Sequence, residues 1–119
     1  MEPMLAHEID NNNEWSVQVM KIAITGANGR IGKVLYSGLM RDDRFIRGID
    51  LKGEPEQKSS NEMVFGDLKN MEFAVEALAD IDVLVHLAAI AEERPWEEIF
   101  PNNFEITYNV FEAAKRVGI

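Results

Sequence analysis

The stretch MKIAITGANGRIG, residues 20–32, decides the fold of this chain. Its first part, Lys21–Thr25, is a short apolar and β-branched run that predicts a buried strand cut off by Gly26. Behind the glycines, one helix face is predicted from the spacing of Ile31, Val34, Leu35, Gly38 and Leu39. We expect that helix to end near Arg41. The stretch therefore predicts a strand, a glycine-rich turn and a helix in direct succession.

The rest of the chain repeats this alternation of short apolar runs and helical periodicity. Strands are predicted at Phe45–Asp50, at Met63–Phe65 and at Val83–Leu87, with a loop between the first two that reaches about Ser60. Two further helices are predicted from Phe73, Ala74, Ala77 and Leu78, and from Phe104, Tyr108, Phe111, Ala114 and Lys115. The last helix should stop at Gly118. Such alternation is typical of α/β proteins with a parallel sheet.

Length and composition limit the chain to one small domain. It has 119 residues, a net charge of −9 and no cysteine. The acidic balance disfavours nucleic acid as a partner, and the absence of cysteine excludes disulfides, thiolate zinc sites and a cysteine nucleophile. No apolar run approaches the ~20 residues of a membrane-spanning helix, and no signal peptide is evident. We expect no membrane contact and take the cytoplasm as the default compartment.

Residues 1–19 differ in character from the remainder. The run Asp10–Glu14 favours turns and solvated backbone, so we interpret residues 1–19 as a flexible acidic N-terminal extension, which Trp15 and Val17 can pin in part. An alternative is that Met20 is the natural start. In either case, we expect the folded domain to be residues 20–119.

The glycine turn carries the main functional signal. A turn between a strand and a helix directs backbone N–H groups and the helix dipole at one point, which suits a pyrophosphate. Gly26 permits the sharp exit from the strand, Gly29 the approach of the phosphates, and Gly32 close packing of the helix. The alternative is a tight turn without a ligand. The P-loop pattern does not fit, because five residues rather than four separate Gly26 from Gly32.

Asp50 is the candidate ribose ligand. It lies 18 residues beyond Gly32, at the end of the second predicted strand, near the offset at which a carboxylate accepts hydrogen bonds from an adenosine ribose. Its charge repels a 2′-phosphate, which favours NAD over NADP, although Arg30 beside the turn partly offsets that repulsion. The alternative is a solvated residue that opens a loop.

With these motifs, the chain resembles the extended short-chain dehydrogenase/reductase family, also called the NAD-dependent epimerase/dehydratase family. The cofactor fingerprint, Asp50, the turn Gly66–Leu68, the strand end His86–Ala89 and the helix around Asn103 match it in order over about residues 20–119. The resemblance implies a partial Rossmann-type parallel sheet of about four strands flanked by helices, with NAD as cofactor. The cofactor-binding residues it implies are Gly26, Asn28, Gly29, Arg30, Ile31, Gly32, Asp50, Leu51, Asp67, Leu68, Leu87, Ala88, Ala89, Ile90 and Asn103.

Within that family, the segment His86–Trp96 and the run from Tyr108 look most like uronate dehydrogenases, which oxidise hexuronic acids to lactones with NAD. This chain departs from them at Ala91, where they carry a substrate-facing serine. The family's chemistry also depends on a Tyr-x-x-x-Lys pair. Here Tyr36 and Tyr108 are followed at i+4 by Met40 and Glu112, so no catalytic residue is assigned.

The resemblance therefore implies the dinucleotide-binding N-terminal half of a sugar or uronate oxidoreductase or of a nucleotide-sugar epimerase or dehydratase, truncated before the catalytic pair. Its expected partners are a dinucleotide and, in the full-length enzyme, a sugar or uronate. The alternatives are a stand-alone NAD-binding sensor and a fragment that self-associates through an open edge at its first or fourth strand, which would give a homo-oligomer.

Other conspicuous residues receive structural interpretations. His86 is flanked by apolar residues, and we expect a core or hydrogen-bonded histidine rather than a catalytic base. Phe104, Tyr108 and Phe111 have helical spacing and are interpreted as core or interface packing. The sequence predicts no metal site, since the two histidines lie far apart and the carboxylates lack calcium-loop spacing.

Overall fold

A computed structural model describes residues 7–9, 15–53 and 61–119. Its main sheet has four strands: β3 (Met20–Thr25), β4 (Arg44–Asp50), β5 (Glu62–Phe65) and β6 (Val83–His86). The order is β5-β4-β3-β6, and all three pairings are parallel. This confirms the predicted parallel sheet of about four strands, and it places each strand within about two residues of its predicted bounds.

Strand order sets where a ligand site can form. From β3 the chain builds outward through β4 to β5 and then returns to pair β6 with the other side of β3. In open parallel sheets, ligands bind at the carboxyl ends of the strands where the order reverses, which here is between β3 and β6. Of the two strands at which an open edge was expected, the first, β3, has a neighbour on both sides, whereas the fourth, β6, lies at an edge. Among the described strands, β5 and β6 are the edges of this sheet.

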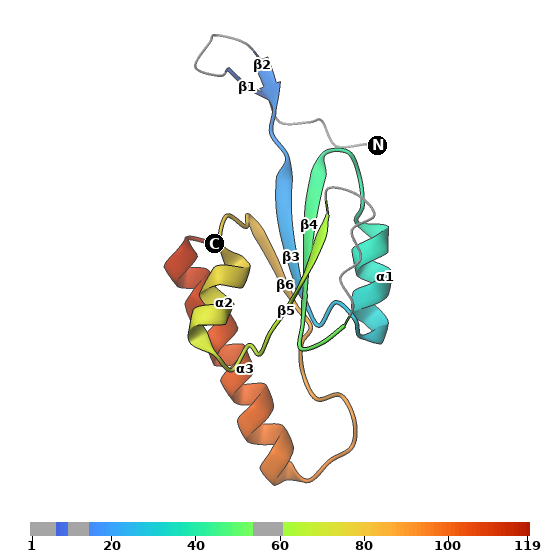
Figure 1. Cartoon of the computed structure of the whole chain (residues 1–119), viewed down its shortest axis with the longest axis vertical. Helices are drawn as coiled ribbons and strands as arrows, with labels where there is room; N and C mark the ends of the chain where they lie inside the picture. Colours follow the sequence, from blue (N-terminus) through green and yellow to red (C-terminus); the bar gives the residue numbers. More distant parts are fainter. Residues whose placement is uncertain (1–6, 10–14, 54–60) are drawn as a thin grey trace.

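Helices cover both faces of the sheet. Helix α1 (Arg30–Gly38) lies on one face, and α2 (Met71–Leu78) and α3 (Trp96–Val117) lie side by side on the other (Figure 1). Asn70 caps α2 by accepting a hydrogen bond from the Phe73 amide at 3.2 Å. The predicted stop of α3 is confirmed, since Gly118 takes the left-handed conformation with φ of 90°.

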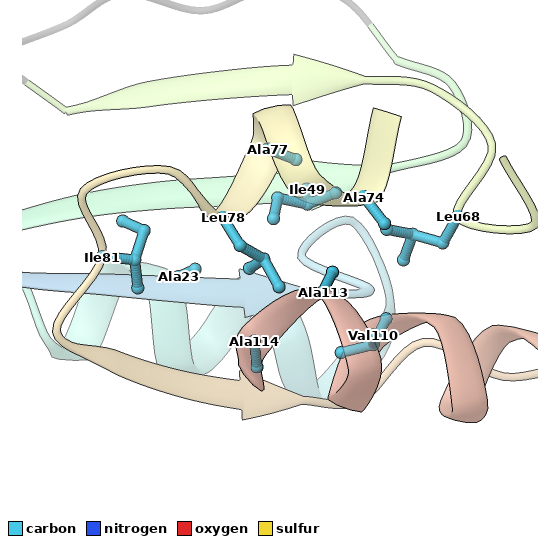
Figure 2. Close-up of a cluster of buried hydrophobic side chains, with 10 residues drawn as sticks. All are labelled: Ala23, Ile49, Leu68, Ala74, Ala77, Leu78, Ile81, Val110, Ala113 and Ala114. Atoms are coloured by element: carbon cyan, nitrogen blue, oxygen red, sulfur yellow. The ribbon is translucent and has the colours of Figure 1, made fainter. Parts of the chain in front are cut away.

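Two apolar clusters hold these layers together. The larger lies between the sheet and α2 and α3 (Figure 2), and the smaller lies under α1. The larger cluster comprises Ala23, Ile49, Leu68, Ala74, Ala77, Leu78, Ile81, Val110, Ala113 and Ala114. The smaller one comprises Ile22, Ile24, Ala27 and Ile46. Alanine is frequent at the helix contacts, and its small side chain lets α2 and α3 approach the sheet closely.

The predicted face of α1 is only partly correct. Leu35 and Leu39 pack on the smaller cluster, but Ile31 and Val34 are 70% and 74% exposed. The helix ends at Gly38 rather than near Arg41. A nine-residue helix that packs alone on one face of a small sheet has only a narrow contact stripe, so part of the apolar pattern faces outward.

The aromatic residues of α3 also differ from expectation. Phe104, Tyr108 and Phe111 are 64%, 58% and 59% exposed, so core packing is wrong for them. The buried stripe of α3 instead carries Val110 and Ala113, which are fully buried. The two stripes have the same helical period, and only the placement of α2 and the sheet decides which one is covered. Interface packing of the aromatic residues stays a prediction.

The N-terminal segment contains a short antiparallel pair that was not predicted. Strand β1 (His7–Ile9) pairs with β2 (Trp15–Val17), which leads into β3 after residues 18 and 19 (Figure 1). The predicted turn at Asp10–Glu14 and the loop at residues 54–60 lie outside the described residues. In the part of the chain that the structure describes, no helix is both long and apolar enough to cross a membrane.

Candidate functional site

The glycine turn lies where the strand order reverses. Gly26 leaves β3 with φ of 71°, a left-handed conformation that glycine adopts without strain. Its amide donates to the Ile49 carbonyl oxygen at 2.8 Å, and the Gly29 amide donates to the Gly26 carbonyl oxygen at 3.0 Å. Helix α1 begins at the next residue, Arg30. The strand, turn and helix therefore follow one another as predicted.

Two glycines of the turn are surrounded by backbone. A Cβ atom at Gly32 would overlap the Gly26 carbonyl oxygen and come within 2.8 Å of the Ala27 Cα. A Cβ at Gly26 would lie 2.9 Å from the Ala88 amide nitrogen. Gly29 is exposed, and its Cβ would meet only the Gly26 oxygen, at 3.2 Å. Gly26 and Gly32 thus bring backbone segments together, while Gly29 leaves the mouth of the turn open.

The first turn of α1 offers unused donors. The first hydrogen bond into the helix runs from the Lys33 amide to the Gly29 carbonyl at 3.0 Å. Among the described residues, the amides of Arg30, Ile31 and Gly32 have no backbone acceptor, and no side chain caps the helix. Such orphan amides, together with the positive end of the helix dipole, suit an anionic group.

Asp50, at the end of β4, borders the same turn. Its Oδ2 accepts a hydrogen bond from the Asn28 amide at 2.8 Å, and its Oδ1 accepts one from the Leu51 amide at 2.7 Å. The Asn28 side chain donates to the Lys52 carbonyl oxygen at 3.1 Å. A carboxylate can accept about four hydrogen bonds, so Asp50 retains acceptor capacity while it holds the turn.

The turn Gly66–Leu68 follows β5 and is tied to the same edge. The Gly66 amide donates to the Asp50 carbonyl oxygen at 3.0 Å. Asp67 is exposed, whereas Leu68 is buried in the larger cluster. The buried side chain of Asn109 on α3 donates to the carbonyl oxygens of Leu68 and Lys69 at 3.0 and 2.9 Å. One amide group therefore holds this turn against α3.

The segment after β6 completes the site. Leu87 and Ala88 pass against Gly26, and Ala89 and Ile90 follow them outside any strand. The Asn103 side chain accepts from the Ile90 amide at 2.7 Å and donates to the Ile90 carbonyl oxygen at 3.2 Å. Asn103, predicted as a cofactor ligand, uses its amide group to hold this segment.

A polar network lies behind Leu87 and Ala88. Both amides donate to the Thr25 hydroxyl oxygen, at 3.0 and 3.1 Å. The hydroxyl group lies 2.6 Å from Nδ1 of His86, whose Nε2 lies 3.2 Å from the Thr107 hydroxyl oxygen. Desolvation by burial lowers the pKa of His86 below its usual 6.5. His86 is thus a hydrogen-bonded histidine, as expected.

Sequence reasoning assigned no site role to Thr25, Thr107 or Asn109. Asn109 had a signal, because it lies four residues before Ala113 on the buried face of α3, where a polar residue needs a partner. Thr25 and Thr107 carried no signal for their contact with His86, since threonine is common in strands and on helices. No group of three or more His, Cys, Asp or Glu side chains within the described ranges could hold a metal ion.

Comparison with known proteins gives consistent matches. A sequence model of the NAD dependent epimerase/dehydratase family matches residues 22–119. Uronate dehydrogenase from Pseudomonas syringae pv. tomato is 29% identical over 100 residues, which are 83% of this chain and 36% of that protein. The chain therefore spans little more than a third of this curated relative.

Solved structures agree with the fold. A uronate dehydrogenase variant from Agrobacterium tumefaciens, complexed with NAD, superposes with a TM-score of 0.76 at 31% sequence identity. The superposition covers 84% of this chain and 38% of the dehydrogenase chain. The protein MoeE5, solved with UDP-glucuronic acid and NAD, has a TM-score of 0.69 at 29% identity, over 83% of this chain and 34% of its own.

Proposed function

We propose that this chain, which belongs to the NAD-dependent epimerase/dehydratase family, forms the dinucleotide-binding part of an NAD-dependent sugar or uronate oxidoreductase. The observation that carries the proposal is the open turn at the start of α1. There the amides of Arg30, Ile31 and Gly32 lack backbone acceptors beside a carboxylate at the end of the next strand.

The residues fit a dinucleotide in four places. The turn 26–32 and the first turn of α1 would hold the pyrophosphate, because their amides and dipole favour anions. Asp50 would accept hydrogen bonds from the adenosine ribose, and Asp67 and Leu68 would border the adenine. Leu87–Ile90 would lie beside the remainder of the cofactor. When bound, the nicotinamide supplies hydride transfer, and this chain's residues supply position.

We further propose NAD rather than NADP as the cofactor. Asp50 is a carboxylate at the ribose position, and a 2′-phosphate placed there would meet a like charge. Its Oδ2 is already held by the Asn28 amide, so the carboxylate cannot readily turn away. The sugar or uronate substrate class is proposed from the relatives, among which are uronate dehydrogenase and an NAD(P)-dependent L-arabinose 1-dehydrogenase.

Replacing Asp50 with alanine tests the cofactor assignment. We expect the chain to bind NAD weakly, and Asp50→Ala to lower the affinity by about 10-fold or more, because charge-assisted hydrogen bonds contribute about 1.5–3 kcal/mol. Asp50→Asn should weaken NAD less and raise the ratio of NADP to NAD affinity. Amide chemical-shift titration of the labelled chain with each dinucleotide measures these affinities.

Asp42→Asn is the matched control, because it removes the same charge from an exposed turn just before the opposite end of β4. It should leave both affinities unchanged. If no amide in residues 26–32 responds to millimolar NAD, or if Asp50→Ala and the control behave alike, the cofactor site is wrongly assigned.

The 119-residue chain should show no dehydrogenase turnover. Neither Tyr36 nor Tyr108 is followed by lysine at i+4, so the chain lacks the pair that the family uses to move the substrate proton. Absorbance of NADH, followed with hexuronic acids and NAD, measures turnover. Sustained NADH formation by the purified chain with any uronate would contradict this expectation.

A further inference from the structure

Three side chains from three different elements meet behind the proposed dinucleotide site. Thr25 ends β3, His86 ends β6 directly opposite it in the sheet register, and Thr107 lies on α3. Thr25 is fully buried. The Thr25 hydroxyl and His86 Nδ1 are 2.6 Å apart, and His86 Nε2 and the Thr107 hydroxyl oxygen are 3.2 Å apart. The imidazole ring thus bridges the sheet and α3.

Counting hydrogens assigns the direction of each bond. A threonine hydroxyl has one proton to donate and two lone pairs to accept. The Thr25 oxygen receives the Leu87 and Ala88 amides, and the Leu87 amide is shared with the Thr25 carbonyl. Among the bonds of the described residues, the only acceptor for the hydroxyl proton is Nδ1 of His86. The hydroxyl therefore donates to Nδ1, and the ring proton lies on Nε2.

The opposite assignment leaves a defect. If Nδ1 carried the proton, three donors would converge on the Thr25 oxygen, and the hydroxyl proton would have no acceptor in a fully buried position. The cost of an unpaired buried donor disfavours that tautomer by about fivefold or more. With the proton on Nε2, the ring donates to the Thr107 oxygen, and both ring nitrogens and the Thr25 hydroxyl are paired.

We propose that Thr25 and His86 are positioning residues that set the Leu87–Ala88 backbone beside the glycine turn, with His86 held neutral in its Nε2–H tautomer. The importance of this for a cofactor rests on the proposed function. The network itself rests on the hydrogen bonds alone. Thr25 gathers two consecutive amides of the segment, and His86 links that hydroxyl to α3 through Thr107.

The position of the segment 87–90 matters because its backbone lies in close contact with Gly26 of the glycine turn. The Ala88 amide nitrogen lies 2.9 Å from where a Gly26 Cβ would be, so the two backbones are in close contact. Asn103 holds Ile90 through both of its backbone groups, two residues farther along. The segment 87–90 is thereby held at one end by Thr25 and at the other by α3, and the turn packs against the Thr25 end.

Protonation of His86 would oppose this arrangement. With a proton on Nδ1, the ring nitrogen becomes a donor, so the Thr25 hydroxyl can no longer donate to it. The Nδ1 proton then competes with the Leu87 and Ala88 amides for the lone pairs of the Thr25 oxygen. Burial also disfavours the protonated ring, and it lowers the pKa of His86 below 6.5. The unfolded chain therefore binds the proton more readily, so the stability contributed by neutral His86 is full above about pH 6.5 and falls as the pH drops through the lowered pKa.

Among the described residues, no charged side chain forms a hydrogen bond or ion pair with the ring. The ring hydrogen-bonds the hydroxyls of Thr25 and Thr107 and packs edge-to-face with the Phe111 ring, with ring centroids 6.0 Å apart. On β3 the charged residue is Lys21, at the opposite end of the strand. On the ring-side turns of α3, Glu112 is paired with Arg116 at 3.2 Å. Titration of the ring should therefore report on the hydroxyl network.

The test is nitrogen-15 NMR of the imidazole ring in the 119-residue chain. His7→Gln leaves His86 as the sole histidine, since the chain has two. We expect the proton on Nε2 at neutral pH, and a titration midpoint below 6.5 at which the Leu87 and Ala88 amide signals move together with the ring. A proton on Nδ1, a mixture of tautomers, or amides that do not follow the ring would overturn the proposal.

Two variants at Thr25 separate positioning from bulk packing. Thr25→Val keeps the shape but removes the hydroxyl, and it should mix the tautomers, raise the midpoint and lower the exchange protection of the Ala88 amide by about fivefold or more. Thr25→Ser keeps the hydroxyl and should retain the Nε2–H tautomer. Equal behaviour of the two variants would overturn the proposal. Should Thr25→Val fail to fold, the tautomer and titration of the His7→Gln chain still decide.

Dinucleotide binding is measured separately on the same samples. A chain with the expected tautomer and no response to NAD would contradict the proposed function and leave the network intact. A chain that binds NAD but carries the proton on Nδ1 would support the proposed function and contradict the hydrogen-bond network. If both hold, Thr25→Val should bind NAD more weakly than Thr25→Ser.

Discussion

Gly32→Ala is expected to destabilise the chain by about 3 kcal/mol or more, the upper range for a single substitution that forces atoms into occupied space. The added Cβ would overlap the Gly26 carbonyl oxygen and lie 2.8 Å from the Ala27 Cα. These are backbone atoms of the turn, so no side-chain rotation relieves the overlap. Either α1 must move away from β3 or the turn must open. Urea unfolding followed by circular dichroism measures the change.

Gly38→Ala is the matched control within the same helix. A Cβ there meets nothing within 4 Å, and the residue is the last of α1. Alanine restricts the unfolded chain more than glycine does, so this variant should be unchanged or more stable by about 0.5–1 kcal/mol. Similar stabilities for the two variants would mean that the turn is not packed as described, and the anion site built on it would fall with it.

Leu78→Ala should cost about 2–5 kcal/mol, the range for removing a large aliphatic side chain from a packed core. Leu78 is fully buried in the larger cluster between the sheet and α2 and α3. Its loss leaves a cavity within the cluster that also contains Ala74 and Val110. Thermal or urea unfolding of the variant measures the cost.

Leu51→Ala makes the same chemical change on a side chain that is 61% exposed, and it should cost no more than about 0.5 kcal/mol. Phe104→Ala extends the comparison to the outward stripe of α3. Phe104 is 64% exposed and stacks on Phe100 with ring centroids 5.5 Å apart, so it should cost far less than Leu78→Ala. A large loss at Phe104 would restore the core role that its spacing suggested.

The order of elements could be predicted because it depends on local chemistry. The apolar run before Gly26 has the length of a buried strand, and the pattern behind Gly32 has the helical period. Gly118 was correctly expected to end α3, because many helices end on a left-handed residue and glycine adopts that conformation without strain.

Burial was harder to predict, because a helical period identifies a stripe without saying what covers it. Ile31 and Val34 carry the right spacing on α1, and Phe104 and Tyr108 carry it on α3, yet all four are exposed. The covered stripe of α3 instead carries Val110, Ala113 and Ala114, of which only Ala114 lay in the expected stripe. Close approach of α2, α3 and the sheet makes small residues the ones that fit.

The sequence by itself determined the strand–turn–helix succession, the glycines that the turn requires and the acidic residue that follows the next strand. These are set by backbone conformation and by spacing along the chain. Only the tertiary structure decided that Thr25, His86 and Thr107 meet, because they are 61 and 21 residues apart and come together through the β3–β6 pairing and the packing of α3. Hydrogen bonds between such distant residues leave no periodic signal, since each depends on register and helix placement rather than on neighbouring residues.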